Sequence, residues 1–152
     1  MENFSQSFTH QLDDKKRVRI PSKLFDQLGA EFVITAGVDN CLYIYTKEYY
    51  DNVFVPKLNA LPMSSQDARY IKRVFMSYTF SIETDKHGRF VLPDELAEIS
   101  HITKNIVTVG MGDHIEIWAQ EVYKDYLSGK PVNFEGSLDI AKALAGLEKF
   151  NF

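Results

Sequence analysis

The chain has 152 residues, 45% of them hydrophobic, and a formal net charge of −4 at pH 7. This length can bury a core in one domain or two small ones, and the longest apolar runs are well short of the roughly 18 residues that a membrane span requires. An acidic balance is unusual for a nucleic-acid-binding domain, and the single cysteine, Cys41, excludes an intrachain disulfide. We expect a cytoplasmic protein that is not associated with membranes.

The first half of the chain predicts the order strand, turn, strand, helix, strand, strand. Alternating polarity places Val18 and Ile20 on the inner side of the second strand, with Arg17 and Arg19 on the outer side. Pro21 suits the first position of the helix, because its missing N–H has no helical partner there. The predicted ranges are strands at 5–12 and 17–20, a polar turn at 13–16, a helix that Gly29 ends, and strands at 32–36 and 42–45.

A helical connection and a second set of the same elements follow. A helix is predicted around 48–54, with interruptions at Pro56 and Pro62, and a second helix opens at the capping sequence 64–67. The second half predicts strands at 78–83, 90–92, 106–109 and 115–118, with a helix from Pro93. The tail from Ser137 has apolar residues at helical spacing and is expected to pack on its own body.

The two halves repeat one plan, with six identical positions at an offset of 72 residues and five more at an offset of 73. Asp13 and Arg17 recur as Asp85 and Arg89, in each case across a short polar turn that leads into a strand ending at proline. A duplicated module explains these identities better than chance does. We expect a first module at 1–54, a helical connection at 55–76, a second module at 77–128 and a C-terminal tail at 129–152.

The repeated aspartate and arginine favour a surface that aims an arginine at DNA. Arginine offers a planar fork of donors that can bind guanine O6 and N7 together, whereas lysine contacts phosphate as a point charge. The aspartate can hold the turn and orient the guanidinium. The alternative is that both pairs are surface ion pairs, worth about 0 to 1 kcal/mol and without function. The predicted DNA-binding residues are Asp13, Lys15, Lys16, Arg17, Arg19, Lys23, Asp85, Lys86, His87, Gly88 and Arg89.

The pattern Asp-x-x-Gly-Arg, followed by alternating residues, proline, an amphipathic helix and a hairpin, resembles the AbrB/SpoVT DNA-binding module. Two copies joined by a helical segment resemble the MraZ family, from about Phe4 to Tyr126. The resemblance implies an α+β fold: a swapped-hairpin AbrB-like β-barrel formed by two homologous halves, with additional helices. It also implies a closed homo-oligomeric ring that binds direct repeats in double-stranded promoter DNA of the division and cell-wall gene cluster, at the nucleoid.

Two residues depart from the family pattern. Lys16 stands where the first loop usually has glycine, and His87 stands where lysine or glutamine is commoner in the second. Lys16 disfavours a tight first turn, because a residue with a side chain is strained at positive φ, although it can add a phosphate contact.

No catalytic, metal or cofactor site is predicted. The four histidines lack metal-ligand spacing and are expected at the surface or in strands, and the Gly110-Met111-Gly112-Asp113 segment aligns with a hairpin turn and not with a phosphate-binding loop. The leading interpretation is a non-enzymatic, sequence-specific transcriptional regulator. The alternative is a protein-interaction scaffold of the same fold that does not bind DNA.

Overall fold

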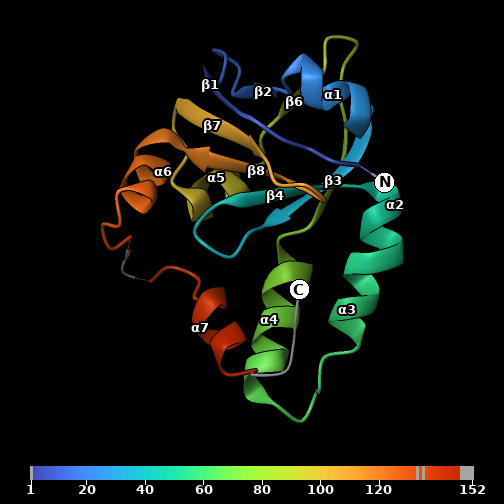
Figure 1. The fold of residues 1–152 in the computed structure, drawn as a ribbon, viewed down its shortest axis with the longest axis vertical. Helices are drawn as coiled ribbons and strands as arrows, with labels where there is room; N and C mark the ends of the chain where they lie inside the picture. Colours follow the sequence, from blue (N-terminus) through green and yellow to red (C-terminus); the bar gives the residue numbers. More distant parts are fainter. Residues whose placement is uncertain (1, 133, 135, 148–152) are drawn as a thin grey trace.

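Six strands form one antiparallel sheet in the order β1-β7-β8-β4-β3-β5, and β2 and β6 form a separate two-stranded ribbon (Figure 1). This computed structural model describes residues 2–132, 134 and 136–147. The strands are β1 (Ser7–Gln11), β2 (Arg17–Arg19), β3 (Glu31–Ala36), β4 (Leu42–Thr46), β5 (Phe80–Glu83), β6 (Arg89–Val91), β7 (Asn105–Gly110) and β8 (Ile115–Ala119). The helices are α1 (Ser22–Leu28), α2 (Lys47–Tyr49), the π-helix η1 (Tyr50–Phe54), α3 (Val55–Asn59), α4 (Gln66–Ser77), α5 (Asp94–Ser100), α6 (Gln120–Leu127) and α7 (Ile140–Ala145).

The two halves of the chain exchange strands. β1 of the first half pairs with β7 of the second, β5 of the second half pairs with β3 of the first, and the ribbon joins β2 to β6. The strands β1 and β2, and likewise β5 and β6, therefore pair with the other half of the chain and not with each other. Neither half could bury its strands alone, because strands of three to six residues offer too little surface.

One hydrophobic cluster confirms that the halves share a core. It contains Val18 and Phe32 from the first half together with Phe90, Ile106 and Trp118 from the second, all of them buried. Phe32 and Phe90 meet edge to face, with ring centroids 5.4 Å apart. The two halves therefore share one core in this structure.

A second cluster lies at the opposite end of the molecule from the ribbon, between the sheet and α3, α4 and α7 (Figure 1). The apolar face of α4 is buried here, including Ile71 and Phe75, and α7 contributes Ile140. Ser65 caps α4 by accepting the backbone N–H of Ala68. Residues 148–152 of the predicted tail lie outside the described residues.

The α+β class and the antiparallel sheet are confirmed, but a closed barrel is not. The hydrogen-bonded order of the six strands leaves β1 and β5 at its two edges, and the ribbon pairs only with itself. The two halves exchange strands, but the described part of the chain has no continuous ring of strand pairing.

Three local predictions need correction. Pro21 is the N-cap of α1 and not its first residue, with extended φ and ψ of −52° and 135°. Pro56 does not interrupt the helical segment, which runs from α2 to α3 through the π-helix. It stands in the first turn of α3, directly after the π-helix, where the hydrogen-bonding pattern changes. Helix α6 was not predicted, although the repeat aligned Glu48 with Glu121 at its start.

None of the described helices is long and apolar enough to cross a membrane. Within residues 2–132, 134 and 136–147, no group of three or more His, Cys, Asp or Glu side chains is placed to hold a metal ion.

Candidate nucleic-acid interface

The β2–β6 ribbon brings arginines from both halves onto one face. In the antiparallel register, Arg17 lies opposite Val91, Val18 opposite Phe90, and Arg19 opposite Arg89. Directly opposed residues project to the same side, so Val18 and Phe90 enter the core while the other four residues form the outer face. We call Arg17, Arg19, Arg89 and Val91 the ribbon face.

Asp13 organises the loop that precedes β2. Its Oδ1 accepts the backbone N–H groups of Lys15 and Arg17, both at 2.9 Å, and its Oδ2 accepts Nε of Arg17 at 2.6 Å. The backbone N–H of Asp13 donates to the carbonyl of Arg17, which closes the turn. One carboxylate therefore fixes both the backbone of the loop and the orientation of the guanidinium.

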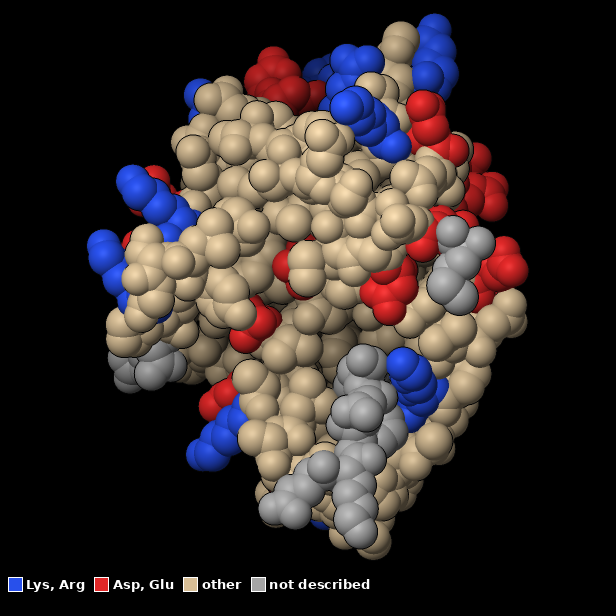
Figure 2. Space-filling view, in the orientation of Figure 1, with Lys and Arg blue, Asp and Glu red and all other residues tan. Residues whose placement is uncertain are grey.

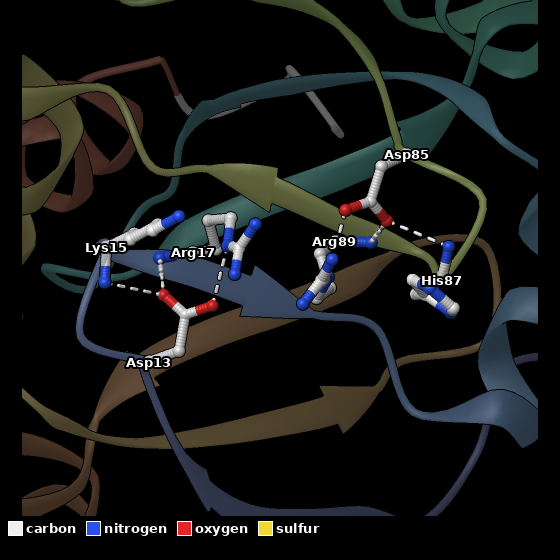
Figure 3. A network of polar contacts seen from close by, with 6 residues as sticks. All are labelled: Asp13, Lys15, Arg17, Asp85, His87 and Arg89. Atoms are coloured by element: carbon white, nitrogen blue, oxygen red, sulfur yellow. Dashed lines mark hydrogen bonds and ion pairs between the residues drawn. The ribbon is translucent and has the colours of Figure 1, made fainter.

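Asp85 repeats this arrangement in the second half (Figure 3). Its Oδ1 accepts the N–H groups of His87 and Arg89 at 2.8 and 3.0 Å, and its Oδ2 accepts Nε of Arg89 at 2.9 Å. The match extends to the same atoms on both residues. The interpretation of each Asp as the residue that orients its Arg agrees with this geometry.

Both guanidinium groups keep their outer nitrogens available. The bonds to Asp13 and Asp85 use only Nε, and in the described part of the chain the Nη atoms of Arg17 and Arg89 have no hydrogen-bond partner. The side chains are only 23% and 29% exposed, so they are held against the ribbon and do not swing freely in water. An anchored Arg with free Nη atoms can donate two parallel hydrogen bonds to a planar acceptor pair.

Lys16 adopts the tight conformation that its side chain disfavours. Its φ is 58°, and its counterpart Gly88 has φ of 73°. The carbonyl of Gly88 accepts the N–H of Ile20 at 3.0 Å, and the carbonyl of Lys16 accepts the N–H of Leu92 at 3.1 Å. These reciprocal bonds join the two halves and hold both turns in the same shape, so the expected disturbance of the first turn is wrong.

Lys16→Gly is expected to stabilise the protein by roughly 0.5 kcal/mol, because relief of the left-handed conformation exceeds the extra entropy of the unfolded chain. Denaturant unfolding measures this change. The matched control is Gly88→Ala, which should destabilise because alanine is strained at a φ of 73°; its Cβ would make only an ordinary contact with the Phe25 ring, at 3.4 Å. Equal stability of Lys16→Gly and the wild type would show that Lys16 carries no strain.

The hydrogen bonds at both aspartates favour the ionised carboxylates. At Asp13 the backbone N–H of Arg17 is the largest cause of a lowered pKa. At Asp85 loss of hydration raises the pKa, but the N–H groups of Arg89 and His87 and the Arg89 side chain outweigh it and lower the pKa to about 2. Both carboxylates are therefore charged throughout the physiological range of pH.

The stabilising effect of Asp85 should depend on pH in the acid range. Because its folded pKa is below the ordinary value of 3.8, the contribution is complete above about pH 4 and is lost as the pH falls through about 2. In Asp85→Asn, the free energy of unfolding should therefore fall less between pH 4 and pH 2 than it does in the wild type. Asp14→Asn, at an exposed neighbour of Asp13, is the control and should leave the curve unchanged.

The remaining predicted residues surround the ribbon face in different ways. Lys15, Lys16, Lys86 and His87 are exposed on the two loops, whereas Gly88 is buried. Lys23 lies on α1, where Nζ donates to the Gln6 side chain at 3.3 Å. Figure 2 shows Lys and Arg side chains gathered at the end of the molecule where β2, β6 and α1 lie in Figure 1, with acidic groups nearby and along other parts of the surface.

A second polar cluster was missed because its members carry no motif. His114 was expected at the surface or in a strand, but it lies just before β8 with a 15% exposed side chain, 2.6 Å from Asp113 and 3.4 Å from Glu116. Trp118 donates to Glu116, and Tyr49 of the first half donates to Asp113. Burial lowers the pKa of His114, but the bonds to Glu116 and Asp113 prevail and raise it. The cluster ties α2 to β8.

Comparison with known proteins gives one consistent family. The family model for the MraZ protein, described as antitoxin-like, matches residues 3–74 and again 75–138. Proteins called "Transcriptional regulator MraZ" are similar to this chain: that of Caldanaerobacter subterraneus subsp. tengcongensis is 38% identical over 84% of the chain and 89% of its own length. That of Clostridium tetani is 41% identical over 81% and 86%, and that of Finegoldia magna 36% identical over 95% and 99%.

Proposed function

The chain belongs to the MraZ family, and from that premise we propose that it is a transcriptional regulator that binds double-stranded DNA through the ribbon face. The predicted set around that face takes four roles. Arg17, Arg19 and Arg89 would reach base edges. Lys15, Lys16, Lys23, Lys86 and His87 would lie near phosphates, Asp13 and Asp85 would orient the arginines, and Gly88 would shape the second turn.

The observation that carries this proposal is the direct opposition of Arg19 and Arg89 on an exposed ribbon. Like charges opposite one another destabilise a strand pair, and Arg19 forms no ion pair with any described residue. Such a pairing is expected where an anionic partner offsets the repulsion. The two aspartates bond only to Nε of Arg17 and Arg89. Because the face has three arginines against these two aspartates, it keeps a net positive charge.

The dimensions of the ribbon suit the major groove. A groove about 12 Å wide admits a two-stranded β-ribbon, and several regulators read DNA with such a ribbon. Directly opposed and diagonal side chains on one face lie about 5 to 8 Å apart, whereas successive bases are about 3.4 Å apart along each strand. The three arginines of one subunit would therefore span roughly two or three base pairs.

The acidic surface elsewhere would orient the complex. With a net charge of −4, most of the body repels DNA, so a productive approach brings the ribbon end forward. We therefore propose that the net negative charge of the chain is compatible with DNA binding. The role is non-enzymatic, and the protein would act in the cytoplasm at the nucleoid.

Further parts of the proposal rest on the resemblance and on the exchange of strands between the halves. These are a swapped-hairpin barrel, modules at 1–54 and 77–128 with a connection at 55–76 and a tail at 129–152, and a closed ring of subunits. The target would be direct repeats in the promoter of the division and cell-wall gene cluster. A ring that presents several ribbon faces would convert modest affinity for one site into strong binding of a repeated site.

Salt-dependent binding to a duplex carrying those repeats tests the proposal. Each neutralised phosphate contributes about −0.9 to the slope of the logarithm of affinity against the logarithm of salt concentration, so the four lysines near phosphates predict a slope of about −3.6 per engaged subunit. The matched variant Lys15→Gln/Lys86→Gln should reduce the slope and keep the base preference. No saturable binding to the repeats at low salt would favour the interaction scaffold instead.

A further inference from the structure

The ribbon has a near twofold symmetry that one residue breaks. At the 72-residue offset, Arg17 corresponds to Arg89, and Arg19 corresponds to Val91. In the register these four residues form two directly opposed pairs, Arg17 with Val91 and Arg19 with Arg89. A twofold rotation that exchanges β2 and β6 therefore places Arg17 on Arg89. The same rotation places Arg19 on Val91.

Val91 is exposed in an unexpected setting. It is 60% exposed, while its inward-facing neighbours on the ribbon, Val18 and Phe90, are 0% and 4% exposed. The other three members of the ribbon face are arginines. A single exposed valine needs no explanation in general. Here, however, it shares the ribbon face with the three arginines that the proposed function directs at DNA bases.

We propose that Val91 is a specificity-determining residue that contacts the C5-methyl group of a thymine in the major groove. This inference rests on the proposed function. Apolar side chains read thymine through that methyl group, whereas arginine reads guanine through O6 and N7. At the two symmetry-related positions, Arg19 would therefore favour guanine and Val91 would favour thymine.

A consequence is that each ribbon reads its site in one direction. A ribbon face with exact twofold symmetry would bind equally well in two orientations and would prefer a palindromic site. Replacement of one arginine by valine makes the face asymmetric, so one orientation of the site is preferred. Subunits that each prefer one orientation suit sites repeated head to tail.

Selection from a random duplex library, with full-length protein, tests this assignment. The wild type should select a site with thymine at one position and no internal palindrome. Val91→Ala should lose the preference at that position and keep the others, and Val91→Arg should shift the selected site towards an internal palindrome. Arg19→Val places valine at both symmetry-related positions. It should also select a palindrome, but the base at the two equivalent positions should differ from the base that Val91→Arg selects there.

A methyl-deletion probe isolates the contact. Replacing the selected thymine by deoxyuridine should weaken wild-type binding about fourfold, the effect of withdrawing one buried methyl group. The same replacement should change binding of Val91→Ala by less than twofold. Because Val91 is exposed, thermal unfolding should show that the variants remain folded.

The outcomes separate the two proposals. If the wild type selects no sequence, the proposed function fails, and this inference fails with it. If the wild type selects a site but Val91→Ala and Val91→Arg select the same site, DNA binding stands and the assignment of Val91 is wrong. A loss of affinity in Val91→Ala that is equal for thymine and deoxyuridine also overturns the assignment, because Val91 would then only support the stem of Arg17.

Discussion

Arg17→Ala should weaken binding to the promoter repeats by roughly 5- to 150-fold per engaged subunit, the equivalent of about 1 to 3 kcal/mol for one lost bidentate base contact. Arg17 is anchored through Nε by Asp13 and has Lys15, Lys16 and Arg19 around it in the sequence. Fluorescence anisotropy with labelled duplex measures the loss. Several ribbons in one assembly could multiply it into an apparent absence of binding.

Three measurements make the result specific. Arg89→Ala should have a smaller effect, because two lysines, Lys15 and Lys16, directly precede Arg17, whereas the loop before Arg89 has one, Lys86. Arg73→Ala, at an exposed position of α4, should bind as the wild type does. Light scattering of the free protein should show unchanged assembly. Wild-type affinity in Arg17→Ala, or a loss caused only by disassembly, would make Arg17 a structural residue.

Phe90→Ala should destabilise the whole protein by about 3 to 5 kcal/mol and keep unfolding as one transition. The Phe90 ring leaves β6 of the second half and packs edge to face on Phe32 of the first, so its removal opens a cavity between the halves. Denaturant unfolding followed by circular dichroism and tryptophan fluorescence measures both features. Val91→Ala, one residue away but exposed, is the control and should change stability by less than about 0.5 kcal/mol.

Non-coincident transitions from the two probes would contradict the shared core, as would a stable monomeric fragment of residues 1–62. Trp118 reports on the second half, and it belongs to the same cluster as Phe32. A single transition at both probes is therefore the expected result for two halves that exchange strands and share one core.

Local patterns predicted most of the elements but not their partners. Alternating polarity correctly assigned the faces of β2, because inward and outward residues are set by the period of a strand. The exchange of β1 and β5 between halves depends on pairings such as Phe8 with Thr108, and no local signal encodes a contact across a hundred residues. Helix α6 was recoverable from the repeat, since its start aligns with that of the predicted helix near Glu48.

In the candidate site, too, the local features were predictable from the sequence and the long-range contacts were not. The role of each Asp followed from its spacing of four residues before an Arg, and the structure has the same bonds in both loops. The opposition of Arg19 and Arg89 could not be predicted, because it depends on the register between strands 70 residues apart. The conformation of Lys16 was misjudged because the cross-half hydrogen bonds that hold its turn are non-local.

Photo-crosslinking tests the central claim, that DNA binds at the ribbon end, most directly. A photoreactive amino acid would replace Lys15 or His87 in the two loops, or Arg73 in α4 at the opposite end of the molecule (Figure 1). With the promoter duplex bound, positions 15 and 87 should crosslink to DNA and position 73 should not. Crosslinks from position 73 with none from positions 15 and 87 would contradict the account.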